Sequence, residues 1–254
     1  MTVFFSDIRS YTTLSEQMTP KENFDFLNSY LGRVGPVIKA NHGFVNQYVG
    51  DGIMALFQTS PEDALQAAIQ IQHTLKNYNE YRKSLGRIPI KVGIGLHTGA
   101  LMMGIIGDQE RMDAGVVSDT VNTASRMEGL TKYYGVSILI SESVIAGIDR
   151  EKFLIRYLGK VQVKGKVEPI DVFDCYQGDD EKIKERKIKS VEDFEKGIQA
   201  YLAKDFKVAA EAFKKVLKIN HSDRTAKMYL NQIDTLLKKP LPKGWTGVVA
   251  MDSK

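Results

Sequence analysis

The sequence predicts an α/β fold that begins in ferredoxin-like order, βαββαβ, continues with extra strands and ends in a short α-helical tail. The first observation is that β-branched and aromatic runs alternate with long amphipathic segments as far as residue 178. The second is a change of composition from residue 179 onward, where charged and helix-forming residues predominate. With 254 residues and 43% hydrophobic content, the chain has enough apolar side chains for a packed core.

Capping residues mark the expected helices. Thr19 and Pro20 begin one helix, which closes near residue 43, and Ser60 and Pro61 begin a second. A third helix is expected through SDTVNTASRMEGLTKYYG. Strands are expected at residues 2–7, 44–49, 52–57, 138–141, 153–159, 160–166 and 169–176, and two more are expected about residues 97–99.

The tail, beyond a first domain of residues 1–178, is expected to have three parts. These are a charged linker or helix start at residues 179–190, a helical tetratricopeptide-like segment at 191–239 and a proline-containing extension at 240–254. Gly197, Ala209 and Phe213 fall in the register of one tetratricopeptide repeat. Since one repeat cannot bury a continuous core, we expect its helices to pack on the preceding domain or on a partner. Trp245 is expected to anchor the extension on an apolar surface.

Composition argues against several kinds of site. The single cysteine, Cys175, lies in a strand-like run, so it predicts a buried thiol and no internal disulfide. The four histidines lack ligand-like spacing, so we expect no zinc site. Residues 179–254 hold 17 Lys+Arg against 12 Asp+Glu, interleaved as on a solvated helical surface, so we expect no nucleic-acid partner.

No transmembrane segment is expected, because the chain has no run of about 18 apolar residues, and the N-terminus does not resemble a signal peptide. We therefore expect a cytoplasmic location. A strand that begins at residue 2 also suggests that this chain is the cytoplasmic part of a longer protein.

Two carboxylates are expected at one edge of the sheet. Asp7 ends the first strand, and Asp51 lies in a Gly-Asp-Gly turn between two later strands. If those strands pair, the carboxylates meet without histidine nearby, a set that suits Mg²⁺ or Mn²⁺ carrying a polyphosphate. Backbone N–H groups in the segment after Asp7 are suited to phosphate oxygens. The alternative is that Asp7 caps a helix entry and Asp51 is an ordinary turn acid.

Three motifs occur in order: FFSDIRSYTTLSE, YVGDGIMALF and SDTVNTASRMEGLTK, followed by VQVKGK. Together they resemble the class III nucleotidyl cyclase catalytic domain, the adenylate and guanylate cyclase family, in its bacterial form. The resemblance covers residues 2 to about 176. It implies a homodimer with two shared sites, in which two divalent cations, Mg²⁺ or Mn²⁺, assist the conversion of ATP (or GTP) to a 3′,5′-cyclic nucleotide. It also implies an upstream sensor or regulatory domain, which this chain lacks.

The resemblance assigns the metals to Asp7, Asp51 and the carbonyl of Ile8. It assigns the phosphates to the segment after Asp7, with Ser10 and Tyr11 in place of the usual Gly-Phe pair. The members of this segment are Ile8, Arg9, Ser10, Tyr11 and Thr12.

In the same resemblance, Asn122 and Arg126 match the pair that positions the ribose and stabilises the transition state. They stand one helical turn apart, on one face. Lys164 matches the lysine that binds the triphosphate, with Lys166 as a competitor. These groups would come from one subunit and the metal ligands from the other.

Two positions choose the purine in this family. Adenylate cyclases usually carry lysine at the first and aspartate or threonine at the second, whereas guanylate cyclases usually carry glutamate at the first. Gln47 and Gly115 stand at these positions and fit neither pattern, although Asp113 could supply the missing second group. A glutamine amide both donates and accepts hydrogen bonds, so we predict weak selectivity for the base.

Adenylate cyclase activity is the preferred prediction, because most bacterial members of the family have it. Guanylate or dual-specificity cyclase activity is the close alternative. A catalytically silent nucleotide-binding regulatory domain is a second alternative, and a helical interaction module centred on the tail is a third.

Overall fold

The computed structural model describes residues 1–107, 112–163, 168–238, 241 and 244–250. The elements, in chain order, are β1 (Thr2–Ile8), α1 (Tyr11–Ser15), α2 (Pro20–Ala40), β2 (Gly43–Val49), β3 (Gly52–Phe57), α3 (Pro61–Ser84), β4 (Val92–Thr98), β5 (Met102–Gly107), β6 (Met112–Val117), α4 (Asp119–Tyr134), β7 (Ile138–Ser141), α5 (Glu142–Ile145), the 3₁₀ helix η1 (Arg150–Lys152), β8 (Ile155–Gln162), β9 (Ile170–Cys175), α6 (Glu181–Leu202), α7 (Phe206–Ile219), α8 (Arg224–Leu237) and β10 (Val249–Ala250).

The main sheet has eight strands in the order β10-β8-β9-β7-β4-β1-β3-β2. Its β4-β1-β3-β2 half is the predicted ferredoxin-like unit, with β1 antiparallel to both β3 and β4. Strands β7, β9 and β8 extend this sheet beyond β4, and β5 pairs only with β6 in a separate two-stranded sheet. The predicted α/β fold class is therefore confirmed.

The two faces of the sheet bury different helices, because successive strand residues point to opposite sides. Phe4 and Ile94 share a core with α2 and α3. Val3 belongs instead to a cluster with Ala124 of α4. Leu139 of β7 packs in a third cluster, which α4 shares with α6, α7 and α8.

Capping positions predicted from the sequence are confirmed for the two long helices. The Thr19 hydroxyl accepts a hydrogen bond from the Glu22 N–H, and the Glu22 side chain accepts one from the Thr19 N–H, which forms a capping box. Ser60 likewise accepts from the Glu62 N–H at the start of α3.

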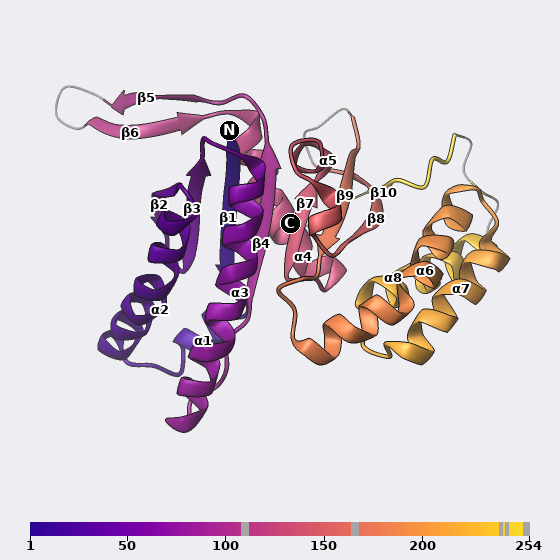
Figure 1. Cartoon of the computed structure of the whole chain (residues 1–254), viewed down its shortest axis with the longest axis horizontal. Helices are drawn as coiled ribbons and strands as arrows, with labels where there is room; N and C mark the ends of the chain where they lie inside the picture. The colour runs from indigo at the N-terminus through magenta and orange to yellow at the C-terminus, as the bar shows by residue number, and fades with distance from the viewer. Residues whose placement is uncertain (108–111, 164–167, 239–240, 242–243, 251–254) are drawn as a thin grey trace.

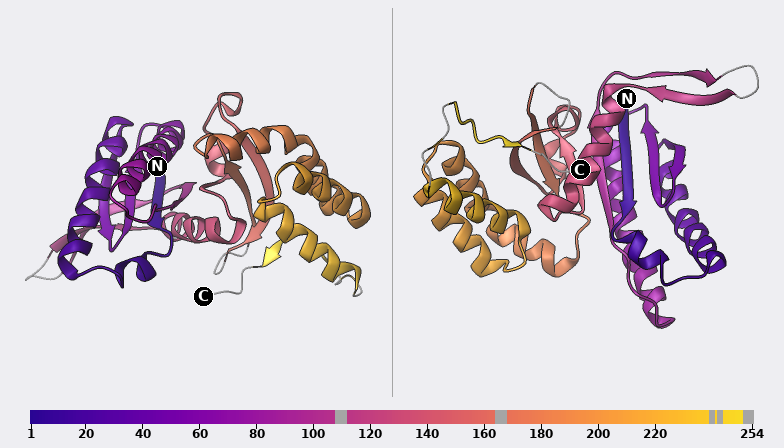
Figure 2. Two further views of the ribbon diagram at one scale, coloured as in Figure 1. Left: turned by 90° about the horizontal axis from the view of Figure 1, so that it is seen from below. Right: turned by 180° about the vertical axis from the view of Figure 1, so that it is seen from behind.

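The tail packs on the domain that precedes it, which is one of the two arrangements expected for a single repeat. Figures 1 and 2 show α6, α7 and α8 beside β8 and β9, at the opposite end of the molecule from α2. A Cβ atom on Gly197 would lie 2.8 Å from the Phe213 ring, so α6 and α7 meet closely here. Trp245 anchors the extension, because its ring packs edge-on against Tyr201 and Phe206.

The structure differs from the predicted elements in three respects. Most of the charged stretch 179–190, expected as a linker or a helix start, is the first half of α6, so the helix start is confirmed and the linker is wrong. The strands expected at 153–159 and 160–166 form one strand, β8, which a bulge between Tyr157 and Gly159 bends. Strands β6 and β10 were not predicted. Across the described residues, no helix is both long enough and apolar enough to cross a membrane.

Candidate active site

The structure brings Asp7 and Asp51 together, as the sequence predicted. β1 and β3 pair directly, and the turn before β3 carries Asp51 to the end of β1. The backbone N–H of Ile8 donates a hydrogen bond to Asp51 Oδ2 at 3.1 Å. Gly50 has φ +61°, a left-handed conformation that favours glycine and makes this turn accessible.

The two carboxylates interact strongly. Burial, a hydrogen bond that protonated Asp51 donates to Asp7 and the negative charge of Asp7 together raise the pKa of Asp51 to about 7. Without a cation, the pair therefore tends to hold a proton near neutral pH. A divalent cation would supply the missing positive charge, and the two carboxylates and the Ile8 carbonyl offer the oxygen ligands that Mg²⁺ or Mn²⁺ prefers.

The segment after Asp7 turns sharply into α1. Ser10 has φ +56°, and its side chain makes no capping hydrogen bond, so the first N–H groups of α1 have no side-chain cap. Tyr11 packs inward: its hydroxyl donates to Asn23 Oδ1 at 2.7 Å, and its ring stacks on Phe26. Tyr11 is thus placed to offer its backbone rather than its side chain to a phosphate.

Arg9 is held by α4. Its Nη1 lies 3.2 Å from Glu128 Oε1, and its Nη2 donates to the hydroxyl of Thr131. Burial lowers the pKa of Arg9, although Glu128 and Asp7 oppose this change. In this arrangement the guanidinium is engaged by α4, and the backbone N–H of Arg9 donates to the Lys91 carbonyl at 2.8 Å, so both groups already have partners within the chain.

Glu128 was not predicted as part of the site. Burial raises its pKa to about 7 despite the ion pair with Arg9, and the charges of Asp7 and Asp51 add to the rise. A signal was available in the sequence, because Glu128 stands next to Met127 and four residues after Ala124, on the apolar face of α4.

Asn122 and Arg126 lie on a different part of α4. Asn122 is exposed and Arg126 half-buried, whereas Ala124 and Met127 face the core. Among the described residues, no hydrogen bond or ion pair connects Asn122 or Arg126 to Asp7 or Asp51. One chain thus holds both the predicted metal ligands and the predicted pair on α4, but no hydrogen bond or ion pair joins the two groups.

The two positions expected to choose the base are also apart in one chain. Gln47 is exposed on the edge strand β2, beside a bulge between Val45 and Gln47 that the sequence did not reveal. Gly115 lies on β6, opposite Gly104 of β5. Figure 1 shows this hairpin at the end of the sheet where β1 begins, whereas Asp7 lies where β1 ends. Lys164, Lys166 and the side chain of Asp113 lie outside the described part.

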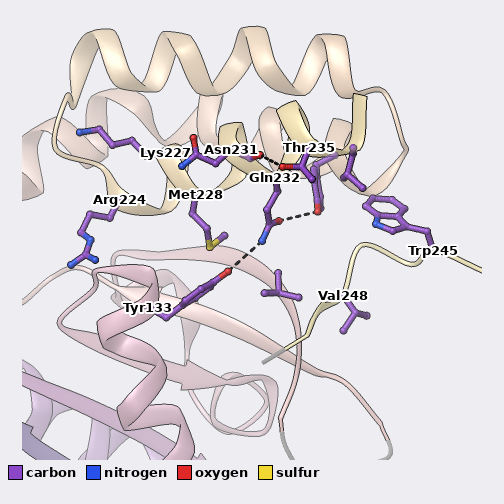
Figure 3. A pocket seen from close by; sticks show the side chains of 12 residues that line it. Tyr133, Arg224, Lys227, Met228, Asn231, Gln232, Thr235, Trp245 and Val248 are labelled. Carbon is purple, nitrogen blue, oxygen red and sulfur yellow. Dashed lines mark hydrogen bonds between the residues drawn. The ribbon is translucent and has the colours of Figure 1, made fainter. Parts of the chain in front are cut away.

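A cavity of about 640 Å³ lies elsewhere, between α8, the C-terminal segment and Tyr133 of α4 (Figure 3). Its lining includes no residue predicted for catalysis, metal or base. This cavity is therefore not the concave site expected for the nucleotide. A nucleotide site that forms between two chains would not be a cavity of one chain.

Residues 1–177 match the family described as the adenylate and guanylate cyclase catalytic domain. The chain belongs to this family. Over 181 residues it is 47% identical to an adenylate cyclase of Anabaena cylindrica, a match that covers 68% of this chain and 36% of that protein. The cyclase domain also resembles the crystal structure of the guanylyl cyclase Cya2, with 33% identity and a TM-score of 0.60, over 68% of this chain and 90% of that one.

A further relative of this cyclase chain is the terminal-differentiation-specific adenylate cyclase of Dictyostelium discoideum, 32% identical over 241 residues. That match covers 91% of this chain, more than residues 1–177 can supply, so it extends into the tail helices. It covers only 11% of the Dictyostelium protein. The chain thus spans about a third or less of the length of these curated relatives.

Proposed function

We propose that this chain is the catalytic part of an adenylate cyclase, which converts ATP to 3′,5′-cyclic AMP and pyrophosphate in a homodimer with two shared sites. The observation that carries the proposal is the meeting of Asp7 and Asp51 at one edge of the sheet, with the pKa of Asp51 raised to about 7. A structural carboxylate pair has no need of such repulsion, whereas a cation site does.

Each group has a role in the proposed reaction. Asp7, Asp51 and the Ile8 carbonyl would hold two divalent cations, which lower the pKa of the ribose 3′-hydroxyl and spread the charge of the phosphoryl group. The N–H groups at the start of α1 would hold phosphate oxygens. Lys164, or its competitor Lys166, would contact the triphosphate.

The remaining roles fall to α4. Arg126 would stabilise negative charge that grows in the transition state, and Asn122 would orient the ribose. The exposure of Asn122 supports a shared site, because a second chain can reach it while Asp51 of its own chain does not contact it. A longer parent protein with an upstream regulatory domain belongs to the same proposal.

ATP is the proposed substrate because the Anabaena relative is named an adenylate cyclase. GTP is the second candidate, since Cya2 is named a guanylyl cyclase and Gln47 and Gly115 carry neither usual pattern. Exposure of Gln47 leaves its amide able to rotate and address either base edge.

The test is to assay purified protein with Mn²⁺ and either nucleotide, and to measure cyclic AMP and cyclic GMP. Asp51→Asn and Arg126→Ala should each abolish turnover. A mixture of equal amounts of the two variants should regain roughly a quarter of the wild-type turnover, because random pairing makes half of the dimers mixed and each mixed dimer has one intact site of two. Turnover of GTP alone would overturn the choice of substrate. Binding of ATP without cyclic product would favour the silent regulatory domain, and failure of the mixture would contradict the shared site.

A further inference from the structure

The carboxyl end of α4, the helix that carries Asn122 and Arg126, is held by the first turn of α8. The Thr225 hydroxyl donates a hydrogen bond of 2.9 Å to the carbonyl of Tyr134, and both residues are buried. This carbonyl is among the last four of α4, which have no partner within the helix. Thr225 therefore completes the end of α4 from outside the cyclase domain of residues 1–177.

Two more contacts join the same helix ends. Gly135 terminates α4 with φ +71°, and a Cβ atom there would lie 2.5 Å from the side chain of Arg224. Figure 3 shows Tyr133 of α4 facing Gln232 of α8, whose Nε2 lies 3.3 Å from the Tyr133 hydroxyl. The end of α4 and the inner face of α8 thus form one continuous seam.

The start of α8 is in turn fixed to the sheet by a buried ion pair. Asp223 caps α8 by accepting from the Ala226 N–H at 3.0 Å, and its Oδ2 lies 2.6 Å from Arg156 Nη1 of β8. Arg156 also pairs with Asp174 of β9 at 2.9 Å, and all three charged side chains are at most 2% exposed. Burial acts to lower the pKa of Arg156, but the two carboxylates outweigh it and raise the pKa. Displacing α8 would separate these buried charges, which is costly.

Two further side chains fasten the tail to β8 and β9. Lys187 of α6 reaches Asp174 at 2.8 Å, and burial, which would lower its pKa, is outweighed by the carboxylates of Asp174 and Asp179. The Tyr229 hydroxyl of α8 donates to the Leu158 carbonyl at 2.5 Å. Together with the core that α4 shares with the tail helices, these contacts make α8 a rigid support.

We propose that the helical segment of residues 181–237 positions α4, with Thr225 as the residue that sets the place of its carboxyl end. The inference rests on the proposed roles of Asn122 and Arg126. A helix held at one end transmits a small displacement along its length, and groups that must align with a reacting phosphate are sensitive to misplacement of about 1 Å. Thr225 is thus a positioning residue, not a catalytic one.

The matched pair of variants is Thr225→Val and Thr235→Val in the full chain. Both remove a hydroxyl from α8, but Thr235 is exposed and donates only within its own helix, to the Asn231 carbonyl at 3.0 Å. We expect Thr225→Val to lower kcat with Mn²⁺ and ATP about tenfold. KM for ATP should change little, because α8 does not touch Asp7 or Asp51. Thr235→Val should leave both constants unchanged. Equal kcat for Thr225→Val and the wild type would overturn the proposal.

Mixed dimers separate positioning from general destabilisation. When one chain carries Asp51→Asn and its partner carries Arg126→Ala, only mixed dimers are active, and their one intact site uses Asp7 and Asp51 of the Arg126→Ala chain and the α4 of the Asp51→Asn chain. Thr225→Val should therefore lower turnover when it lies in the Asp51→Asn chain and have no effect when it lies in the partner. Equal loss in both arrangements would show a merely structural role and reject the inference.

Hydrogen exchange gives a readout that does not depend on turnover. We expect faster amide exchange across α4 in Thr225→Val than in the wild type, and no change in Thr235→Val. Unchanged exchange in α4 would overturn the inference even in an active enzyme. A wild-type chain that makes no cyclic nucleotide would instead overturn the proposed function, and exchange in α4 would still decide whether Thr225 holds the helix.

Discussion

At the scale of one residue, the raised pKa of Asp51 links the proposed cation site to the stability of the protein. Its pKa is raised to about 7 by burial and by Asp7, whereas an unfolded aspartate titrates near 3.9. A group whose folded pKa is raised stabilises the fold below the unfolded pKa and loses that contribution as pH rises through the folded pKa. The metal-free protein should therefore lose stability between about pH 4 and 7 at this site.

A bound cation should offset this loss, so Mn²⁺ binding should depend on pH. Because Mn²⁺ competes with the proton on Asp51, we expect its affinity to rise about tenfold between pH 6 and pH 8. Titration calorimetry at the two pH values measures the change, and the melting temperature should gain more from Mn²⁺ at pH 8. Asp51→Asn should remove both effects, and equal affinity at the two pH values would contradict the assignment.

Gln47 carries a second prediction at this scale. The side chain is exposed on an edge strand, so Gln47→Lys should fold normally. A lysine can only donate hydrogen bonds, so the change should raise the ratio of kcat/KM for ATP over GTP, by up to about tenfold for one exposed polar contact. Gln58→Lys makes the same change at another exposed glutamine, just after β3, and should leave the ratio unaltered. An unchanged ratio in Gln47→Lys would argue against its place at the base.

At the scale of the element, the sequence predicted what local chemistry determines. Thr19 and Ser60 cap their helices as expected, and Asp51 lies in the expected Gly-Asp-Gly turn, because these features depend on a few neighbouring residues. The meeting of Asp51 with Asp7 also needs β1 to pair with β3, a pairing that was a condition of the sequence-based prediction. The bulge beside Gln47 was not predictable in this way, since strand pairing decides where a residue is left over. The contacts of Arg9 were not predictable either, because its partners on α4 lie more than a hundred residues away in the sequence.

The separate hairpin of β5 and β6 shows the same limit. The sequence predicted strands on both sides of residues 97–99 but no β6, because glycines and a short apolar run hide the strand period. Only the structure shows that β5 leaves the main sheet.

At the scale of the whole molecule, the boundary between domain and tail is a composition boundary rather than a folding boundary. Residues 1–177 match the cyclase domain, yet β8 and β9 bury one of their faces against α6 and α8. Composition could not reveal this, because the apolar faces of α6, α7 and α8 could equally have covered a partner. The buried pair of Arg156 and Asp223 joins the two parts, and these residues lie 67 positions apart in the sequence.

This joint gives a prediction for the stability of the whole chain. Burial alone would raise the pKa of Asp223, but Arg156 outweighs it and lowers the pKa. A carboxylate whose folded pKa is depressed adds stability above the unfolded pKa and loses it as pH falls through the folded pKa. Asp223→Asn should therefore lower the free energy of unfolding by about 3 kcal/mol at pH 7, because it leaves Arg156 buried without a full countercharge.

The difference between the wild type and Asp223→Asn should begin to shrink as pH falls below about 3.9, where the unfolded carboxylate first binds a proton, and should keep shrinking toward the lowered folded pKa. Urea unfolding of both proteins at pH 7 and at pH 3 to 4 measures it. Asp234→Asn, an exposed site on the same helix, should cost less than about 0.5 kcal/mol at either pH. If Asp223→Asn were as stable as the wild type at pH 7, the tail would not be tied to the sheet through Arg156. A single unfolding transition would then no longer be expected, because residues 1–178 could unfold apart from α6, α7 and α8.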